Sequence, residues 1–148
     1  GGERKMKKLF YSAFVYLLTA LASGVLWREI TKTLNISEPT ALGTVHTHLF
    51  SLGFIMFLLF ILLEKNFHVS EAPKFNLFFI LYHIGVILSS TFMLVRGITS
   101  MLVIKGTMEI TSGLNGAISG MSGIGHIILT VALVIYMFLL KEKVAPET

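Results

Sequence analysis

Four long apolar stretches, separated by short polar segments, dominate the pattern of hydrophobic and polar positions along the chain. They cover residues 9–27, 42–63, 75–95 and 114–140. Each is at or above the roughly 18–20 residues that an α-helix needs to cross the hydrocarbon core of a bilayer. The pattern predicts an all-α protein with four membrane-spanning helices, and we expect residues 1–148 to form a single transmembrane domain.

The segments between these stretches restrict how successive helices can be arranged. They comprise residues 28–39, 64–74 and 96–112, and none is long enough for a second domain. Short connections place successive helices antiparallel, so we expect an up-down-up-down four-helix bundle. The last stretch, 27 residues long, would measure about 40 Å as a helix and must tilt or protrude from the bilayer.

Composition and charge agree with an integral membrane protein. The chain is 54% apolar and 14% charged and has no cysteine, and its mean hydropathy is +0.80. These values exclude an ordinary soluble domain, and the missing cysteines exclude disulfides and thiolate metal sites. The formal net charge is +4, but the basic residues flank the apolar stretches. We therefore expect a lipid bilayer as partner, and no nucleic acid.

The distribution of basic residues predicts the orientation in the membrane. Eight Lys and Arg residues lie on the side of both termini and of the second connection, against four on the other side. Because positive residues favour the cytoplasmic side, both termini are expected inside, in a multi-pass protein of the bacterial plasma membrane.

Histidines are the candidate functional residues. Four of the five fall inside predicted helices, where polar side chains are costly: His46, His48, His83 and His126. Any one of them could simply hydrogen-bond to a neighbouring helix. Four histidines on three helices favour a binding site instead.

The geometry of an α-helix limits how the two histidines of the second stretch can act. His46 and His48 are two residues apart and therefore point about 200° away from each other, so they cannot chelate one metal ion. Counted from the helix ends, His48 lies about 10 Å below the outer surface, and His126 reaches a similar depth if its helix protrudes outward. Small neighbours, including Gly43 and Gly53, favour an inward-facing position for His46.

The fourth stretch carries glycines that share one face of the predicted helix. They are Gly113, Gly116, Gly120 and Gly123, and His126 continues the same face three residues later. This glycine stripe can be a small-residue packing face, within the chain or against a second copy of it. A flat surface beside a histidine also suits a haem, with His126 as axial ligand and Gly120 and Gly123 against the macrocycle.

Two arginines extend this hypothesis. Arg28 and Arg96 lie at the outer ends of the first and third apolar stretches, where a guanidinium can pair with haem propionates. Each can equally extend its side chain to the membrane interface without binding anything.

Two segments carry a resemblance to known proteins. Residues 24–32 (GVLWREITK) and 43–53 (GTVHTHLFSLG), with the four-span layout, resemble a family of small bacterial membrane proteins described as a domain of unknown function. The resemblance covers essentially the whole chain. It implies the fold and the membrane location, and it brings no activity.

A looser resemblance involves only His46, His48, Leu49 and Gly53. These residues are similar to a His-x-His helix of the haem-copper oxidase catalytic subunit and of haem membrane proteins of the nitric oxide response. In the oxidases such a pair ligates two centres on opposite sides of one helix. This chain has four spans and no copper-binding triad, so the resemblance does not imply oxygen reduction.

These observations lead to two hypotheses about function. In the first, the protein binds one or two haem b groups through pairs of histidines and serves electron transfer or redox or gas sensing, with a membrane redox partner and no open iron position for substrate. In the second, the intramembrane histidines bind zinc or copper in a transport or assembly protein. His126 pairs with His48 or His46, and His83 ligates a second centre or hydrogen-bonds to a ligand.

Overall fold

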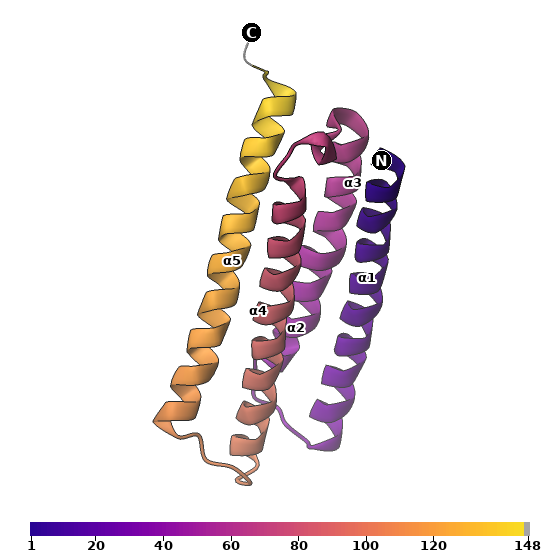
Figure 1. The fold of residues 1–148 in the computed structure, drawn as a ribbon. Coiled ribbons are helices and arrows are strands. Elements are labelled where there is room, and N and C mark those ends of the chain that lie inside the picture. The colour runs from indigo at the N-terminus through magenta and orange to yellow at the C-terminus, as the bar shows by residue number, and fades with distance from the viewer. Residues whose placement is uncertain (147–148) are drawn as a thin grey trace.

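The protein is an all-helical bundle in a computed structural model that describes residues 1–146 (Figure 1). Its elements are α1 (Gly2–Thr33), α2 (Leu42–His48), the π-helix η1 (Leu49–Ile55), α3 (Met56–Phe67), the short 3₁₀-helix η2 (Val69–Glu71), α4 (Phe75–Ile104) and α5 (Ser112–Val144). The elements α2, η1 and α3 follow one another without a break and form one rod, residues 42–67.

Four helical segments are long and apolar enough to cross a membrane: α1, the rod, α4 and α5. They alternate in direction, so that both ends of the chain lie at the same end of the bundle (Figure 1). The predicted membrane-spanning four-helix bundle is thereby confirmed. We refer to the end that carries both termini as the terminal end, and the expectation that it faces the cytoplasm stays a prediction.

The helices are longer than the apolar stretches suggested, and all three connections are correspondingly shorter. The first helix continues to Thr33, and the third continues to Ile104, eight residues beyond Arg96. Arg96 does not end its helix, and side chains of α5 bind its guanidinium at the surface of the bundle. Beyond it, Gly97 packs against the backbone of Leu42.

Local backbone chemistry sets most of the helix ends. A residue with a positive φ follows each of α1, α3 and α4: Asn35 (φ 52°), His68 (φ 51°) and Gly106 (φ 73°), respectively. This left-handed conformation ends an α-helix. The last helix begins after Thr111, whose hydroxyl accepts a hydrogen bond from the backbone N–H of Leu114.

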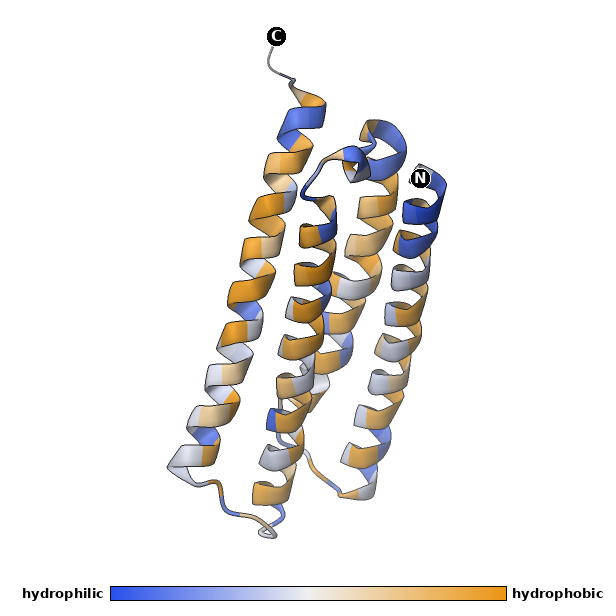
Figure 2. Cartoon of the chain, viewed as in Figure 1, coloured by the Kyte–Doolittle hydropathy of each residue, from blue (hydrophilic) through white to orange (hydrophobic). Residues whose placement is uncertain are grey.

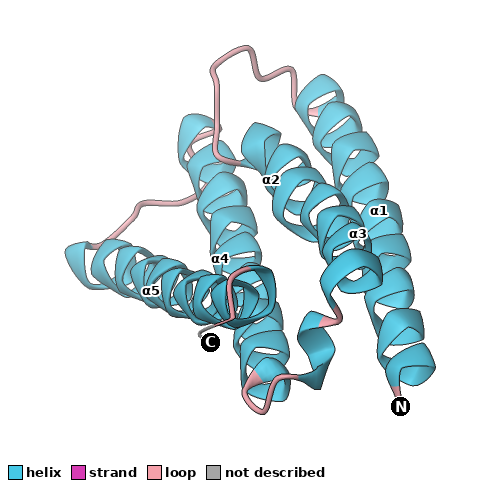
Figure 3. Ribbon diagram, turned by 90° about the horizontal axis from the view of Figure 1, so that it is seen from above, coloured by secondary structure: helices cyan, strands magenta, loops and turns pink. Residues whose placement is uncertain are grey.

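The spans are arranged in a row instead of a closed square. Viewed from above, α1 lies beside the rod, α4 lies on the other side of the rod, and α5 packs against α4 (Figure 3). Over the described chain, no Cα atom of α1 comes within 8 Å of one in α4. The rod therefore occupies the middle of the bundle.

Close contact between α4 and α5 depends on two glycines. A Cβ added at Gly85 would lie 2.8 Å from the backbone nitrogen of Leu129, and one added at Gly125 would lie 2.8 Å from that of Ser89. Helices in lipid associate through close packing at small residues, because burial from lipid supplies little driving force. Both glycines are therefore required for this helix crossing.

Aromatic rings fill the bundle toward the terminal end. Phe60 contacts the rings of Phe78, Tyr82 and Tyr136, with centroids 4.7–5.2 Å apart. All four residues are buried. They join the rod, α4 and α5 into one core.

The π-helix η1 directly follows His48 in the rod. Seven residues, Leu49–Ile55, adopt this wider winding. The hydroxyl of Tyr82 in α4 donates a hydrogen bond to the Leu52 carbonyl within it. On the other side Gly53 packs against the ring of Tyr16 in α1. Such segments are frequent at functional sites because they redirect side chains along a helix.

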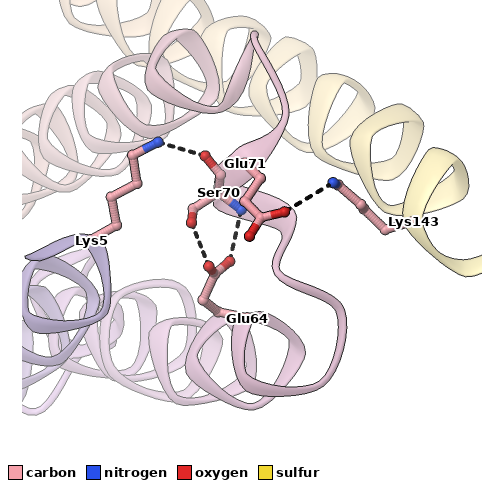
Figure 4. A network of polar contacts seen from close by, with 5 residues as sticks. All are labelled: Lys5, Glu64, Ser70, Glu71 and Lys143. Carbon is pink, nitrogen blue, oxygen red and sulfur yellow. Dashed lines mark hydrogen bonds and ion pairs between the residues drawn. The ribbon is translucent and has the colours of Figure 1, made fainter. Parts of the chain in front are cut away.

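A polar network secures the connection between α3 and α4 (Figure 4). The buried carboxylate of Glu64 accepts hydrogen bonds from the Ser70 hydroxyl and, at 2.8 Å, from the Ser70 backbone N–H. Lys5 donates to the Ser70 carbonyl at 2.6 Å. An ion pair between Lys143 and Glu71, 3.6 Å apart, attaches α5. The network ties α1, α3 and α5 to the connection that leads into α4.

Candidate functional site

The structure brings together His48 of α2 and His126 of α5, next to α4. Their ring centroids lie 5.9 Å apart, and the ring planes are inclined at 55°. His48 is half-buried, and its Nε2 atom lies 3.0 Å from the hydroxyl oxygen of Ser89 in α4. Ser89 belongs to the closely packed α4–α5 crossing, so the helix contact also positions this imidazole.

A backbone hydrogen bond determines which nitrogen of His126 is free. Its Nδ1 atom lies 2.7 Å from the Ser122 carbonyl oxygen, which can only accept. Nδ1 therefore carries a proton, and in the neutral imidazole Nε2 keeps its lone pair. Metal-binding histidines are typically oriented in this way, by a hydrogen bond from the nitrogen that does not bind the metal.

A pocket of about 470 Å³ lies next to His126, between α2, α4 and α5. Its lining includes Thr44, Met93, Arg96, Ser122 and Gly123. The volume falls within the range of small-molecule and cofactor sites.

The pocket has a positive electrostatic character because Arg96 is its only charged lining residue. The Arg96 guanidinium donates to the side-chain oxygen of Asn115 at 2.5 Å and to the hydroxyl of Ser119 at 2.7 Å. No carboxylate within residues 1–146 forms an ion pair with it. Its charge is therefore available to an anionic group.

His46 lies on the opposite face of the same helix, toward α1. Its ring stacks on Trp27, with centroids 5.4 Å apart and planes inclined by 11°, and packs against Gly24. The Nδ1 atom is buried and has no hydrogen-bond partner in the described structure. His46 and Arg28 line two pockets beside α1, of about 600 and 270 Å³. His46 therefore does not meet His126.

His83 occupies a third position, between α4 and α1. Tyr16 places its hydroxyl 2.7 Å from Nδ1, and Ser12 places its hydroxyl 3.2 Å from Nε2. Ser12 also donates to the Lys8 carbonyl. With that donation in place, Nε2–H donates to Ser12 and Nδ1 accepts from Tyr16. Both ring nitrogens are therefore occupied.

The structure does not bring His46 and His83 together as ligands of a second centre. His46 packs against Gly24, whereas His83 contacts Tyr16, eight residues earlier on the same helix. At 1.5 Å per residue, these two positions on α1 are about 12 Å apart along the axis.

The glycine stripe of α5 does not pack within the chain. A Cβ added at Gly113, Gly116, Gly120 or Gly123 would meet no other atom within 4 Å, and all four glycines are exposed. Gly123 lines the pocket beside His126, and Gly120 does not. A homodimer formed through the stripe stays a prediction.

The predicted site residues thus separate into three places. His126, Arg96 and Gly123 line the pocket between α2, α4 and α5, and His48 lies next to His126. His46 and Arg28 lie beside α1, and His83 lies between α1 and α4. Sequence reasoning did not identify Ser89, Asn115 or the Ser122 carbonyl. Serine and asparagine in an apolar helix were the available signal, but their partners lie on other turns or helices.

Comparison with known proteins identifies the family of the chain. The profile of a family described as "Protein of unknown function (DUF2871)" matches residues 6–143. The chain belongs to this family. No curated protein and no solved structure matches it. The resemblance inferred from residues 24–32 and 43–53 is thereby confirmed, and the family description assigns no activity.

Proposed function

We propose that the protein is a b-type haem protein of the bacterial plasma membrane, in which His48 and His126 are the axial ligands. It would serve electron transfer or redox or gas sensing, with a redox partner in the membrane. The observation that carries the proposal is the meeting of these two imidazoles beside the α4–α5 pocket.

The number of ligands favours haem over a bare metal ion. Within residues 1–146, no three His, Cys, Asp or Glu side chains form a group that could hold a metal ion. Protein zinc sites use three or four such ligands. A porphyrin supplies four nitrogens of its own, so two histidines on opposite sides complete the coordination of its iron.

The separation of the two imidazoles also fits this arrangement. The ring centroids lie 5.9 Å apart, which would leave room for a metal about 2 Å from one nitrogen of each ring. The lone pair of His126 Nε2 is free, as its hydrogen bond to Ser122 requires. The Ser89 hydroxyl donates to the Val86 carbonyl, so Nε2–H of His48 donates to Ser89 and Nδ1 is the nitrogen that would bind.

The other residues of the pocket have separate roles in the proposal. Gly123 leaves the surface of α5 flat beside His126. Arg96 supplies a fixed positive charge for a carboxylate, because Asn115 and Ser119 hold its guanidinium in place. When bound, a haem with two histidine ligands supplies one-electron redox chemistry without an open position for substrate.

A zinc or copper site is the second candidate, because His126 is exposed on the same side of α5 as the glycine stripe. A second copy packed on that face would bring another His48–His126 pair nearby. Four imidazoles would satisfy a tetrahedral ion. This candidate requires a dimer, whereas the haem proposal requires one chain.

The absorption spectrum of the purified protein tests the proposal. Protein produced in haem-sufficient cells should show the Soret band of a low-spin haem. His126→Ala and His48→Ala should each remove that low-spin spectrum. His46→Ala is the matched control, since it removes an imidazole two residues away on the other face of the helix, and it should keep the spectrum. Circular dichroism verifies that each variant is folded.

Two results would overturn the proposal. One is a folded wild-type protein without haem after reconstitution with hemin. The other is an unchanged spectrum in His126→Ala. Zinc or copper at a fixed ratio to protein, lost in both His48→Ala and His126→Ala, would establish the second candidate instead.

A further inference from the structure

A large cavity lies away from the His48–His126 pair, in a groove between α1 and α4. Its volume is about 850 Å³, and Val45 and Leu49 of the rod form its floor. The groove exists because α1 and α4 are separated by the rod, as the view from above shows (Figure 3). His83 of α4 hydrogen-bonds to Ser12 and Tyr16 of α1, and all three residues line the groove.

The walls of the groove are largely hydrocarbon over most of its length. Exposed apolar side chains such as Val15 in α1 and Ile87 in α4 form its edges, so it opens sideways toward the membrane. From Lys8 to Ser23 the groove follows α1 for 15 residues, or about 22 Å. One leaflet contributes roughly 15 Å of hydrocarbon. An acyl chain running from the surface to the bilayer midplane therefore fits along it.

The mouth of the groove at the terminal end is strongly basic. Arg4, Lys7 and Lys8 all line it, and all three are exposed. Lys7 is 4.0 Å from Glu3, while Arg4 and Lys8 form no ion pair with any residue of 1–146. The first turns of α1 are the most hydrophilic part of that helix (Figure 2).

We propose that this groove binds one anionic phospholipid, with the phosphate headgroup at Arg4, Lys7 and Lys8 and an acyl chain along the α1–α4 groove. The charge of the mouth selects a headgroup of net negative charge over a zwitterionic one. Basic pockets between helices at the membrane surface bind anionic lipid headgroups in this way. The site is separate from the proposed haem site and does not depend on it.

Native mass spectrometry of the purified, delipidated full chain tests the proposal. The probes are phosphatidylglycerol and phosphatidylcholine with identical acyl chains. Phosphatidylglycerol should bind at one molecule per chain and more tightly than phosphatidylcholine. The triple variant Arg4→Gln, Lys7→Gln, Lys8→Gln should weaken phosphatidylglycerol binding about 10- to 100-fold.

Two further variants separate the groove from general surface charge. The triple variant Lys65→Gln, Lys74→Gln, Lys141→Gln removes the same charge from the same end of the bundle, and none of these residues lines the groove. It should change the affinity less than about twofold. Val15→Trp places a large ring at an exposed edge of the groove and should lower lipid retention while the chain stays folded.

Several outcomes would overturn the proposal. Equal loss in both triple variants would mean that only general surface charge attracts the lipid. Full retention of lipid in Val15→Trp would place the acyl chain outside the groove. Equal affinity for the two probe lipids would show that the basic mouth does not recognise the charge of the headgroup. A dimer cross-linked through Val15→Cys that excludes lipid would make the groove a protein interface.

Discussion

The hydroxyl oxygen of Ser89 lies 3.0 Å from Nε2 of His48, whereas the hydroxyl of the next residue, Ser90, is buried and has no hydrogen-bond partner among residues 1–146. The two serines are adjacent on α4 but face different neighbours. Ser89 faces the His48–His126 pair, and Ser90 faces the α1–α4 groove. Substitution of Ser89 therefore tests the contact with His48, and substitution of Ser90 provides the control.

We expect Ser89→Ala to weaken cofactor binding at His48. Removing a hydrogen bond that orients a metal-binding histidine typically lowers the affinity for the metal by about 10- to 100-fold, and we expect a similar loss of cofactor affinity here. The measurement is a hemin titration followed by the Soret absorbance. Ser90→Ala should keep the wild-type affinity, and an equal loss in both variants would show that the His48–Ser89 contact has no specific role.

We expect Gly125→Ala to destabilise the bundle through the α4–α5 crossing. The new methyl group would lie 2.8 Å from the backbone nitrogen of Ser89, which has no space to move. Overpacking of this kind costs about 1–3 kcal/mol. Unfolding in mixed detergent micelles measures the change. Gly120→Ala adds the same methyl group where no atom lies within 4 Å, so it should not lower the stability of the single chain and should raise it slightly through helix propensity.

The exposed glycine stripe leads to a separate prediction about assembly. If two copies associate through Gly116, Gly120 and Gly123, then Gly120→Leu should reduce the dimer fraction, because the larger side chain holds the two helices apart. Chemical cross-linking in native membranes gives that fraction. Ile127→Leu, a conservative change at an exposed position of the same helix, serves as the control. An unchanged fraction in Gly120→Leu would exclude the stripe as the interface.

Glu64→Ala should destabilise the terminal end of the bundle. It removes the buried carboxylate that accepts two hydrogen bonds from Ser70 and leaves both donors without a partner (Figure 4). Such a loss costs about 1–3 kcal/mol. Glu71→Ala breaks only the partly exposed ion pair with Lys143 and should cost about 1 kcal/mol or less. Thermal unfolding compares the two, and equal midpoints would contradict the assigned role of Glu64.

The orientation of the chain can be determined with single cysteines, because the natural chain has none. If both termini are cytoplasmic, Asn66→Cys is protected from a membrane-impermeant maleimide in intact cells. Lys105→Cys, in the connection between α4 and α5, is labelled under the same conditions. Permeabilised cells provide the control for reactivity. The opposite labelling pattern would reverse the predicted topology.

The number of spans and the placement of the two neighbouring histidines were predictable from the sequence. A bilayer sets the length of an apolar helix, so four apolar stretches indicated four spans, all of which the structure contains. Helix periodicity placed His46 and His48 on opposite faces, and they do face α1 and the α4–α5 pair respectively. The helix ends were less predictable, since α4 continues past Arg96, whose partners Asn115 and Ser119 lie on another helix.

Only the tertiary structure decided how each helix is rotated and which neighbour it meets. In a soluble protein the polar face of a helix identifies its outside, whereas a membrane helix is apolar on the side that faces lipid as well as on the side that faces protein. Gly125 and the glycines of the stripe therefore look alike in the sequence. The shape of α4 brings Gly125 against Ser89 and leaves the stripe exposed. The same rotation places His126 beside His48, because close packing at small residues, rather than hydropathy, sets the orientation of α5.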